Sequence, residues 1–257
     1  MPSEEPKKNL LLQSFGDSIN VAVIGANGGI GQSLVEQLSL SHCVNIFFPI
    51  SCKGIYHQSA NANGIYIDLE DENIIANAAS AIRKTVHELD VVCVATGILH
   101  SRNNLLPEKS WKSLDFASME AVFRVNTIGP ALVAKHFLPL LSVKKRSALA
   151  ILTAKVGSIS DNFLGGWYSY RASKAVLNMI IRTLSIEMAR RNADTVCVGL
   201  HPGIVDTKLS KPYQRGVEPE KLFSAKKSAK YLLQVLDSMS PKNSGFIYSW
   251  DGVELPY

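Results

Sequence analysis

Short apolar runs alternate with longer stretches of helical periodicity along most of the chain. Several of these runs are continuous and rich in β-branched residues, as in strands that helices cover on both faces. The predicted strands are Asn20–Ile24, Val44–Phe48, Gly64–Asp68, Asp90–Ala95, Ala148–Thr153, Thr195–Leu200 and Gly245–Ser249. The predicted helices between them are Ile30–Leu40, Glu72–Glu88, Met119–Leu141, Tyr168–Arg191 and Ala225–Met239.

This alternation predicts an α/β fold, a doubly wound parallel sheet of about seven strands in the manner of a Rossmann fold. We expect the crossovers between parallel strands to be right-handed. No repeat, low-complexity segment or linker divides the chain, so we predict a single domain, residues 19–257, after an N-terminal extension, residues 1–18. Two irregular regions, Leu99–Ser118 and Pro202–Ser224, are long enough to form loops over a binding site.

Composition narrows the class of protein. Hydrophobic residues make up 46% of the chain and charged residues 19%, which supports a large buried core. The net charge is +5, but the basic residues are scattered and not interleaved with aromatic ones, so we predict no nucleic-acid partner. The four cysteines form no CxxC pair and the six histidines are dispersed, so we predict no metal site. No apolar run approaches the roughly 20 residues that span a bilayer, and we expect a soluble, cytoplasmic protein without membrane attachment.

A glycine-rich turn follows the first predicted strand and opens a helix. A pyrophosphate bound at a helix N-terminus needs close backbone approach, which a Cβ would prevent, while the N–H groups and the helix dipole favour its negative charge. The turn therefore predicts a dinucleotide site, with an ordinary glycine-rich turn as the alternative. The residues assigned to this site are Gly25, Asn27, Gly28, Gly29, Ile30 and Gly31.

The spacing of three of these glycines, GxxxGxG at Gly25, Gly29 and Gly31, resembles the short-chain dehydrogenase/reductase family rather than the common GxGxxG fingerprint. The resemblance implies contacts with the cofactor's adenine from Asp68 and Leu69, after the third predicted strand. It also implies cofactor contacts from the turn after the fourth strand, where the family has Asn-Ala-Gly and this chain has Ala95, Thr96 and Gly97. Ala95 has no side-chain amide with which to brace the neighbouring strands.

The end of the second predicted strand bears on the choice of dinucleotide. In NAD-preferring sites an acidic residue at this place accepts hydrogen bonds from the ribose 2′-OH. This chain has Ser51, Cys52 and Lys53 instead. Ser51 is able to hydrogen-bond a 2′-phosphate and Lys53 to neutralise it, although Lys53 is equally explained as a solvated loop residue. Because no acid is present, we favour NADP(H) over NAD(H).

Tyr170 and Lys174 are four residues apart in the segment Tyr-Arg-Ala-Ser-Lys, so on a helix they face the same way. A free tyrosine, with a pKa of about 10, exchanges protons poorly near neutral pH. We expect the Lys174 ammonium to favour the phenolate and so to lower the pKa of Tyr170. Such a pair can exchange a proton with a substrate oxygen while hydride moves to or from a nicotinamide ring, and Lys174 can also hold the nicotinamide ribose. We therefore count Asn126, Tyr170 and Lys174 among the cofactor-binding residues as well. The same Tyr–Lys spacing also arises by chance in amphipathic helices. Here the pair follows the glycine turn within an alternating α/β pattern, and this context makes the signal specific.

The resemblance adds an asparagine and a Pro-Gly turn. Asn126 occupies the place where the family has an Asn that holds a proton-relay water linked to the lysine; the alternative is a structural amide at a kink before Pro130. After the sixth predicted strand, His201–Thr207 resembles the family's turn against the nicotinamide, and a plain Pro-Gly turn is the alternative. The nicotinamide contacts that it implies are Pro202, Gly203, Val205 and Thr207.

The chain departs from the family after the fifth strand. The family has a substrate-polarising serine there, in Ser-Ser-x-x-Gly, and alignment on Gly157 puts Ala154 at its position. Thr153 stands one residue earlier, and Ser158 lies 12 residues before Tyr170 but beyond the glycine. We assign the polarising hydroxyl to Thr153 or Ser158 with equal weight, or to no residue at all.

Four longer segments are similar to the C-factor branch of the family: residues 157–162, 165–170, 201–207 and 250–257. The similarity as a whole covers about residues 19–257. The resemblance implies an NADP(H)-dependent oxidoreductase that transfers hydride between nicotinamide and a small-molecule carbonyl or alcohol, as a homodimer or homotetramer. The alternative is a nucleotide-binding signalling or regulatory protein with weak or no turnover. We expect Trp167 to form an apolar wall of the substrate cleft or to pack within its own surface loop.

Overall fold

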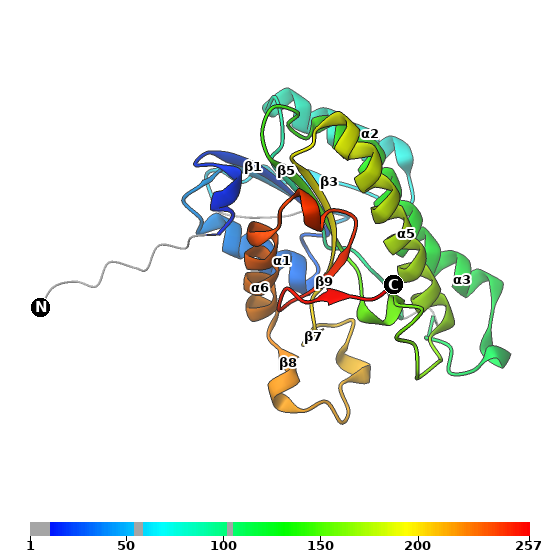
Figure 1. Cartoon of the computed structure of the whole chain (residues 1–257). Coiled ribbons are helices and arrows are strands. Elements are labelled where there is room, and N and C mark those ends of the chain that lie inside the picture. Colours follow the sequence, from blue (N-terminus) through cyan, green and yellow to red (C-terminus); the bar gives the residue numbers. More distant parts are fainter. Residues whose placement is uncertain (1–10, 54–58, 102–104) are drawn as a thin grey trace, which may run out of the picture.

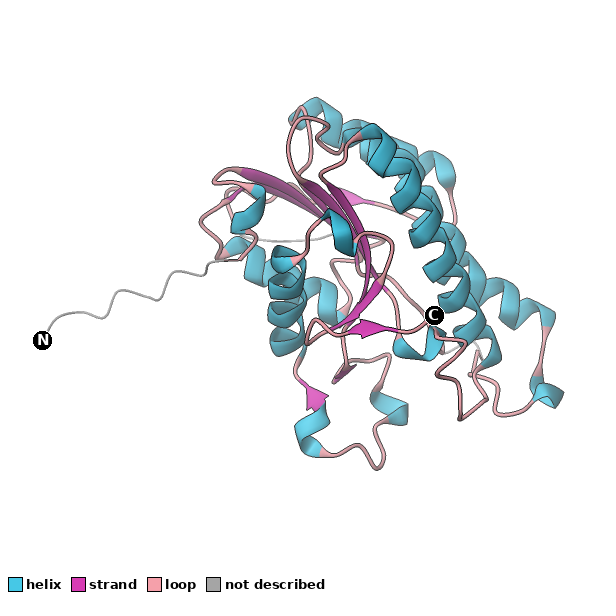
Figure 2. Ribbon diagram, viewed as in Figure 1, coloured by secondary structure: helices cyan, strands magenta, loops and turns pink. Residues whose placement is uncertain are grey.

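The structure, a computed structural model, describes residues 11–53, 59–101 and 105–257 as a sheet between two layers of helices (Figure 1, Figure 2). The order of strands in the sheet is β10-β9-β6-β5-β4-β1-β2-β3. The strands are β1 (Ile19–Ile24), β2 (Val44–Ser51), β3 (Ile65–Tyr66), β4 (Val91–Val94), β5 (Ser147–Leu152), β6 (Thr195–His201), β9 (Ile247–Ser249) and β10 (Glu254–Leu255). All pair in parallel except β10, which is antiparallel to β9. The prediction of a doubly wound parallel sheet is confirmed, with one antiparallel strand added at its edge.

Helices cover both faces of the sheet. They are α1 (Gly29–Ser39), α2 (Glu72–Thr85), α3 (Phe116–Phe123), α4 (Gly129–Phe137), α5 (Tyr168–Arg191) and α6 (Ala225–Ser238). One apolar cluster joins α1 and α6 to one face, and a second joins α2, α4 and α5 to the other. Every residue of β4 is buried, as is nearly every residue of β1 and β5. Burial on both faces explains why these strands read as unbroken apolar runs rather than as alternating ones.

The crossover through α6 corrects our expectation of uniformly right-handed connections. The step from β1 to β2 through α1 and the step from β6 to β9 through α6 run in opposite directions along the sheet. Nevertheless α1 and α6 pack against each other on the same face. Two crossovers on one face that step in opposite directions have opposite hands. The β6–α6–β9 connection is therefore left-handed if the others follow the usual right-handed rule.

The stretch predicted as one helix, Met119–Leu141, is interrupted. Helix α3 ends at Phe123, a π-helical turn covers Arg124–Ile128, and α4 begins at Gly129. Pro130 explains the break, because it has no N–H to donate to the Asn126 carbonyl in the α-helical pattern. The break therefore falls at Asn126, which was assigned to the site from the sequence.

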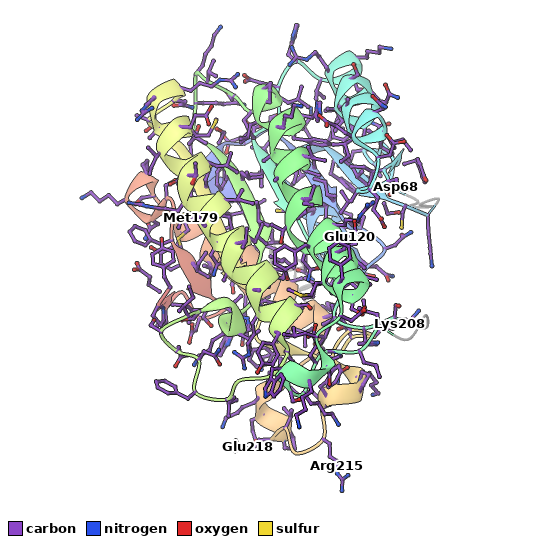
Figure 3. All side chains as sticks on the ribbon, turned by 90° about the vertical axis from the view of Figure 1, so that its right-hand side faces the viewer. Asp68, Glu120, Met179, Lys208, Arg215 and Glu218 are labelled. Carbon is purple, nitrogen blue, oxygen red and sulfur yellow. The ribbon has the colours of Figure 1, made fainter. Side chains whose placement is uncertain are left out.

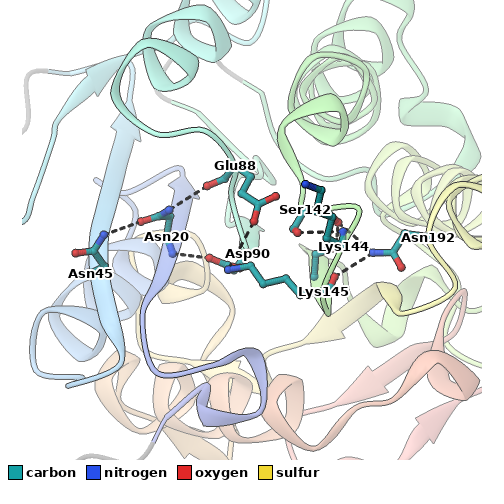
Figure 4. Close-up of polar contacts among 9 residues, drawn as sticks. Asn20, Asn45, Glu88, Asp90, Ser142, Lys144, Lys145 and Asn192 are labelled. Atoms are coloured by element: carbon teal, nitrogen blue, oxygen red, sulfur yellow. Dashed lines mark hydrogen bonds and ion pairs between the residues drawn. The ribbon is translucent and has the colours of Figure 1, made fainter.

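A polar network closes the amino-terminal edge of the sheet, opposite the predicted site (Figure 4). Asp90 is fully buried there and accepts from the Asn20 backbone N–H at 2.8 Å. The Lys145 ammonium lies 2.7 Å from its other carboxylate oxygen. Asn20 also donates to the Glu88 carbonyl at 3.0 Å. Such a buried charge needs a partner of opposite sign, so the network fixes β1, β4 and the loop before β5 relative to one another.

Part of the segment assigned to an N-terminal extension belongs to the core. Leu11, Leu12 and Phe15 are buried and join the apolar cluster around α1 and α6. Residues 1–10 lie outside the described residues. No helix among the residues described is long and apolar enough to cross a membrane.

Candidate active site

A cleft lies where the carboxyl ends of β1, β4, β5 and β6 meet, the edge at which open α/β sheets bind their ligands. It has one half of about 490 Å³ and one of about 290 Å³. The two halves adjoin, because both are lined by Asn27, Gly28, Ala95, Thr96 and Gly97. All five residues were predicted from the sequence to contact a dinucleotide, and the structure brings them together.

The glycine turn after β1 is packed so tightly that side chains are excluded. Gly25 has a φ of +88°, and a Cβ on it would lie 2.7 Å from the Ala95 carbonyl oxygen. A Cβ on Gly29 would lie 2.7 Å from the Thr207 methyl group, and one on Gly31 would collide with the Gly25 backbone. Helix α1 begins here without a side-chain cap. Its first N–H groups are therefore available to an anion in the cleft.

The smaller half of the cleft lies at the ends of β2 and β3. It is lined by Ser51, Asp68 and Leu69, which the sequence assigned to the cofactor site. The Ser51 hydroxyl is already engaged, since it donates to the Lys53 carbonyl at 2.5 Å. Asn27 donates to the same carbonyl at 3.2 Å, while the Lys53 side chain is exposed and does not line the cavity. Asn27 and Ser51 thus hold the Lys53 backbone at the rim of this half.

One buried polar atom in the cleft lacks a protein partner. The Thr96 Oγ1 is buried and makes no hydrogen bond with any described residue. Thr96 lines both halves of the cleft. A buried hydroxyl without a partner is costly, so a polar ligand group at this place would be favoured. With the glycine turn, this hydroxyl makes the cleft a good fit for a dinucleotide that spans both halves.

The larger half holds the Tyr170–Lys174 pair, one turn apart on α5. Lys174 is 3% exposed, and its ammonium donates to the Leu152 carbonyl at 3.0 Å. Burial lowers the pKa of Lys174 to about 8. Burial also raises the pKa of Tyr170 to about 12, so the lowering that we expected from the lysine does not occur in this structure. Desolvation disfavours both charged forms and outweighs their mutual stabilisation.

Asn126 is fully buried in the π turn and its side chain is saturated with protein contacts. Its Oδ1 accepts from the Ile98 N–H at 2.7 Å, and its Nδ2 donates to the Ile98 carbonyl at 2.9 Å. The same Nδ2 also donates to the Ser173 hydroxyl at 3.1 Å. The side chain therefore ties the segment after β4 to α5, and it does not line the cavity.

Of the two candidate polarising hydroxyls, only that of Thr153 belongs to a residue lining the cavity. It donates to Asn178 Oδ1 at 2.6 Å, and both side chains are buried. Ser158 is buried too, but its hydroxyl accepts from the Asp161 N–H at 3.1 Å within its own loop. Ala154 carries no hydroxyl. Thr153 is therefore the only one of these three residues with a hydroxyl at the cavity, and that hydroxyl already donates to Asn178.

Trp167 is not among the residues that line the cavity, and its ring packs against those of two tyrosines. Its ring lies edge to face with that of Tyr170, with centroids 6.2 Å apart, and with that of Tyr213, at 5.0 Å. Tyr213 in turn contacts His100, which lines the cavity. The rings link the loop before α5 to the loops after β4 and β6.

Not every predicted residue lines the cleft. Those that do not line it are Gly31, Lys53, Asn126, Ser158, Gly203 and Val205. Sequence reasoning missed cavity residues that directly follow recognised motifs, namely Ile98, Leu99, His100, Lys208 and Leu209. Their adjacency to the turns after β4 and β6 was the available signal.

The family model described as short chain dehydrogenase matches residues 20–218 of this chain. The chain belongs to the short-chain dehydrogenase family. This short-chain dehydrogenase is 29% identical over 255 residues to an uncharacterized oxidoreductase of Schizosaccharomyces pombe, with 91% of this chain and 96% of that protein covered. It is 35% identical over 144 residues to C-signal of Myxococcus xanthus, which covers 56% of this chain and 81% of C-signal.

The fold agrees with this assignment. The structure matches the NADPH-bound carbonyl reductase from chicken fatty liver with a TM-score of 0.79 and 28% identity, over 93% of this chain and 99% of that one. The resemblance to short-chain dehydrogenases and to C-factor is thus confirmed. The protein is an oxidoreductase of this family.

Proposed function

We propose that the protein is an NADP(H)-dependent reductase that transfers hydride between the nicotinamide ring and a small-molecule carbonyl or alcohol. One observation carries the proposal: Tyr170 and Lys174 line the same cavity as the glycine turn at the start of α1. A proton donor and a dinucleotide site then open onto one space. That arrangement is what a coupled transfer of hydride and proton requires.

The glycine turn would hold the pyrophosphate against the first N–H groups of α1, and the smaller half of the cleft would hold the adenosine beside Asp68 and Leu69. The larger half would hold the nicotinamide beside Pro202 and Thr207. When bound, NADP(H) supplies or accepts the hydride. The protein's own part is to orient the ring, exclude water and manage one proton.

Tyr170 is suited to supply that proton in the reducing direction. With a pKa of about 12, its phenol is protonated at neutral pH and so can donate to the oxygen of a carbonyl as hydride arrives. The reverse reaction needs the phenolate, which burial disfavours. We therefore expect carbonyl reduction to be the faster direction near neutral pH.

A water between Asn126 and Lys174 would reload the phenol with a proton. Asn126 lies in the π turn where the α-helical pattern is broken, because Pro130 has no N–H to donate to its carbonyl. Gly97 keeps space open here, since a Cβ on it would lie within 3.7 Å of both Asn126 Oδ1 and the Lys174 ammonium. Its lowered pKa makes Lys174 able to exchange protons near neutral pH.

The preference for NADP(H) rests on the end of β2. No acid there opposes a 2′-phosphate, Ser51 lines the adenosine half, and the exposed Lys53 follows it. The chicken relative was solved with NADPH. Titration of cofactor fluorescence should give a lower Kd for NADPH than for NADH, and Lys53→Ala should weaken NADPH alone. Tighter binding of NADH would reverse the preference.

A second candidate function follows from the missing serine. Ala154 has no hydroxyl and that of Thr153 is bonded to Asn178, so the site lacks a free polarising donor. A nucleotide-binding regulatory protein with weak or no turnover would tolerate this loss, and C-signal is among the relatives. Such a protein would bind NADPH without oxidising it in the presence of carbonyl compounds.

We infer that the protein forms a homodimer or homotetramer. Helix α5 exposes Val176, Met179 and Ile186, and Figure 3 shows Met179 on the face where α5 runs beside the helix that carries Glu120. Phe116 is likewise exposed at the start of α3. Apolar side chains on two adjacent helices suit a two-fold contact. Light scattering at micromolar concentration should give a multiple of the mass of one chain.

We propose a cytoplasmic location. Among the described residues all four cysteines are free, as expected in a reducing compartment. Cell fractionation would test this.

Isotope transfer tests the proposed function directly. The protein is incubated with NADPH that carries deuterium at C4 of the nicotinamide and with a panel of aldehydes and ketones, whose carbonyl carbon keeps the transferred label. We expect the alcohol formed to carry one deuterium from one face of the ring. Binding of NADPH without transfer to any compound would instead support the regulatory alternative.

A further inference from the structure

The helix that carries Tyr170 and Lys174 begins without a cap of its own. Trp167 occupies the N-cap position of α5 with a φ of +51°, and no side chain from its own segment caps the helix. Tyr168, Ser169 and Tyr170 are therefore the first three residues of the helix. Their N–H groups have no partner within the helix, since the first turn of any α-helix leaves such donors unsatisfied.

Glu108, from the loop after β4, supplies the missing cap. One carboxylate oxygen accepts from the Ser169 N–H at 3.1 Å, and the other accepts from the Ser169 hydroxyl. The Glu108 backbone carbonyl also accepts from the Trp167 N–H at 2.5 Å. Glu108, 61 positions before Ser169 in the chain, thus holds both Trp167 and Ser169 at the start of the helix.

The charge of Glu108 is compensated by the helix rather than by a cation. Glu108 is 4% exposed, and none of the ion pairs among the described residues includes it. A buried carboxylate without a cation is costly unless hydrogen bonds and a favourable potential stabilise it. The N-terminus of a 24-residue helix provides both. Glu108 is therefore built into this place and is not an accidental surface contact.

The same contacts determine where the Tyr170 ring lies. Ser169 and Trp167, both held by Glu108, flank the start of the helix, and the Trp167 ring packs edge to face against the Tyr170 ring at 6.2 Å. Release of Glu108 would free the first turn to fray and Trp167 to move away from the tyrosine. The hydroxyl of Tyr170 would then lose its fixed position in the cavity.

We propose that Glu108 is a positioning residue of the active site, which caps α5 and clamps Trp167 so that the Tyr170 hydroxyl is aligned with the reacting oxygen. The proposal rests on the proposed function, because it assigns Glu108 an effect on proton transfer by Tyr170. The proposal also gives the loop after β4 two roles: Ile98 to His100 line the cavity, and Glu108 holds the start of α5. Glu108 itself touches no substrate.

The test compares Glu108→Ala, Glu108→Gln and Asp71→Ala in the full chain. Asp71 is the matched control, because its carboxylate caps α2 by accepting from two backbone N–H groups, and α2 carries no reacting group. We expect Glu108→Ala to lower kcat about 10- to 100-fold, since a misplacement of about 1 Å has that effect, while the Kd for NADPH changes less than twofold. Glu108→Gln retains an acceptor for the Ser169 N–H and should restore kcat to within about fivefold of wild type. Asp71→Ala should leave kcat unchanged.

Amide hydrogen exchange separates this proposal from the proposed function. The Ser169 and Tyr170 amides should exchange at least about tenfold faster in Glu108→Ala than in wild type, while the Leu177 amide in the middle of α5 is unaffected. If wild type reduces no carbonyl compound, the proposed function fails, and the exchange rates still report whether Glu108 caps the helix. A kcat within twofold of wild type in Glu108→Ala, or unchanged exchange at Ser169, overturns the proposal.

Ser169→Ala keeps the proposal testable if Glu108→Ala does not fold. This variant removes the hydroxyl partner and leaves the backbone N–H to the carboxylate. We expect kcat to fall about three- to tenfold with the Kd for NADPH unchanged. A loss of NADPH binding equal to the loss of kcat would indicate general damage and contradict a positioning role.

Discussion

We predict that the buried Lys174 ammonium lowers the free energy of unfolding of the protein when no nucleotide is bound. Comparison of wild type with Lys174→Met measures this effect. Burial lowers the pKa of its ammonium from 10.5 to about 8. At about 1.4 kcal/mol per pKa unit, this difference corresponds to roughly 3 kcal/mol of destabilisation at any pH below 8. Methionine fills nearly the same space and carries no charge. The Leu152 carbonyl loses its donor in the variant, which offsets about 1–3 kcal/mol of the gain.

The pH dependence gives the sharper prediction. Between pH 8 and pH 10.5 the unfolded wild type binds a proton at Lys174 that the folded protein has released, so wild-type stability rises with pH in this window. The variant has no such group. The free energy of unfolding of wild type minus that of Lys174→Met should therefore rise by roughly 3 kcal/mol from pH 7 to pH 10.5. Folding raises the pKa of Tyr170 from 10.0 to about 12, so this residue lowers stability from about pH 10 upward, but it is present in both proteins and its contribution cancels in the difference.

Urea denaturation of nucleotide-free protein, followed by tryptophan fluorescence at half-unit steps of pH, measures this difference. Groups that titrate alike in both proteins cancel in the subtraction. A difference that stays flat from pH 7 to pH 10.5 would refute the reasoning, because the ammonium would then be as well solvated in the folded state as in the unfolded state. The same variant should show no turnover, because we assign the Lys174 ammonium both to the nicotinamide ribose and to proton transfer.

Other substitutions test individual parts of the site. Gly25→Ala places a Cβ 2.7 Å from the Ala95 carbonyl at a φ of +88°, so it should destabilise the fold by about 1–3 kcal/mol and abolish NADPH binding, as measured by thermal denaturation and fluorescence titration. Thr153→Val should lower kcat more than Ser158→Ala, because only Thr153 lines the cavity; equal losses in steady-state assays would count against this order.

Local patterns made much of the fold and site predictable. The apolar runs of β1, β4 and β5 are continuous because helices cover both faces, and this burial is legible in the residues themselves. The glycine turn was recognisable because Gly25 and Gly29 meet steric limits that only glycine satisfies. The same holds for Tyr170 and Lys174, whose spacing places them on one side of a helix.

Features set by distant contacts were not predictable in this way. The hand of the α6 crossover depends on the packing of α6 against α1, and the cap of α5 comes from Glu108 across 61 residues. We expected Lys174 to lower the pKa of Tyr170, and burial raises it instead. The spacing of two residues in the sequence does not show how deeply their side chains are buried. The π turn at Asn126 is an intermediate case, since Pro130 predicted an interruption of the helix but not that it would be a π turn.

Paired kinetics and binding of wild type and Tyr170→Phe test the central claim most directly. The substitution removes one oxygen and keeps the ring that packs against Trp167. On the carbonyl compound that wild type reduces fastest, we predict that kcat falls by about 10²–10⁴-fold, while the Kd for NADPH stays within twofold. A Tyr170→Phe variant that keeps the wild-type kcat would contradict the assignment of Tyr170 as the proton donor.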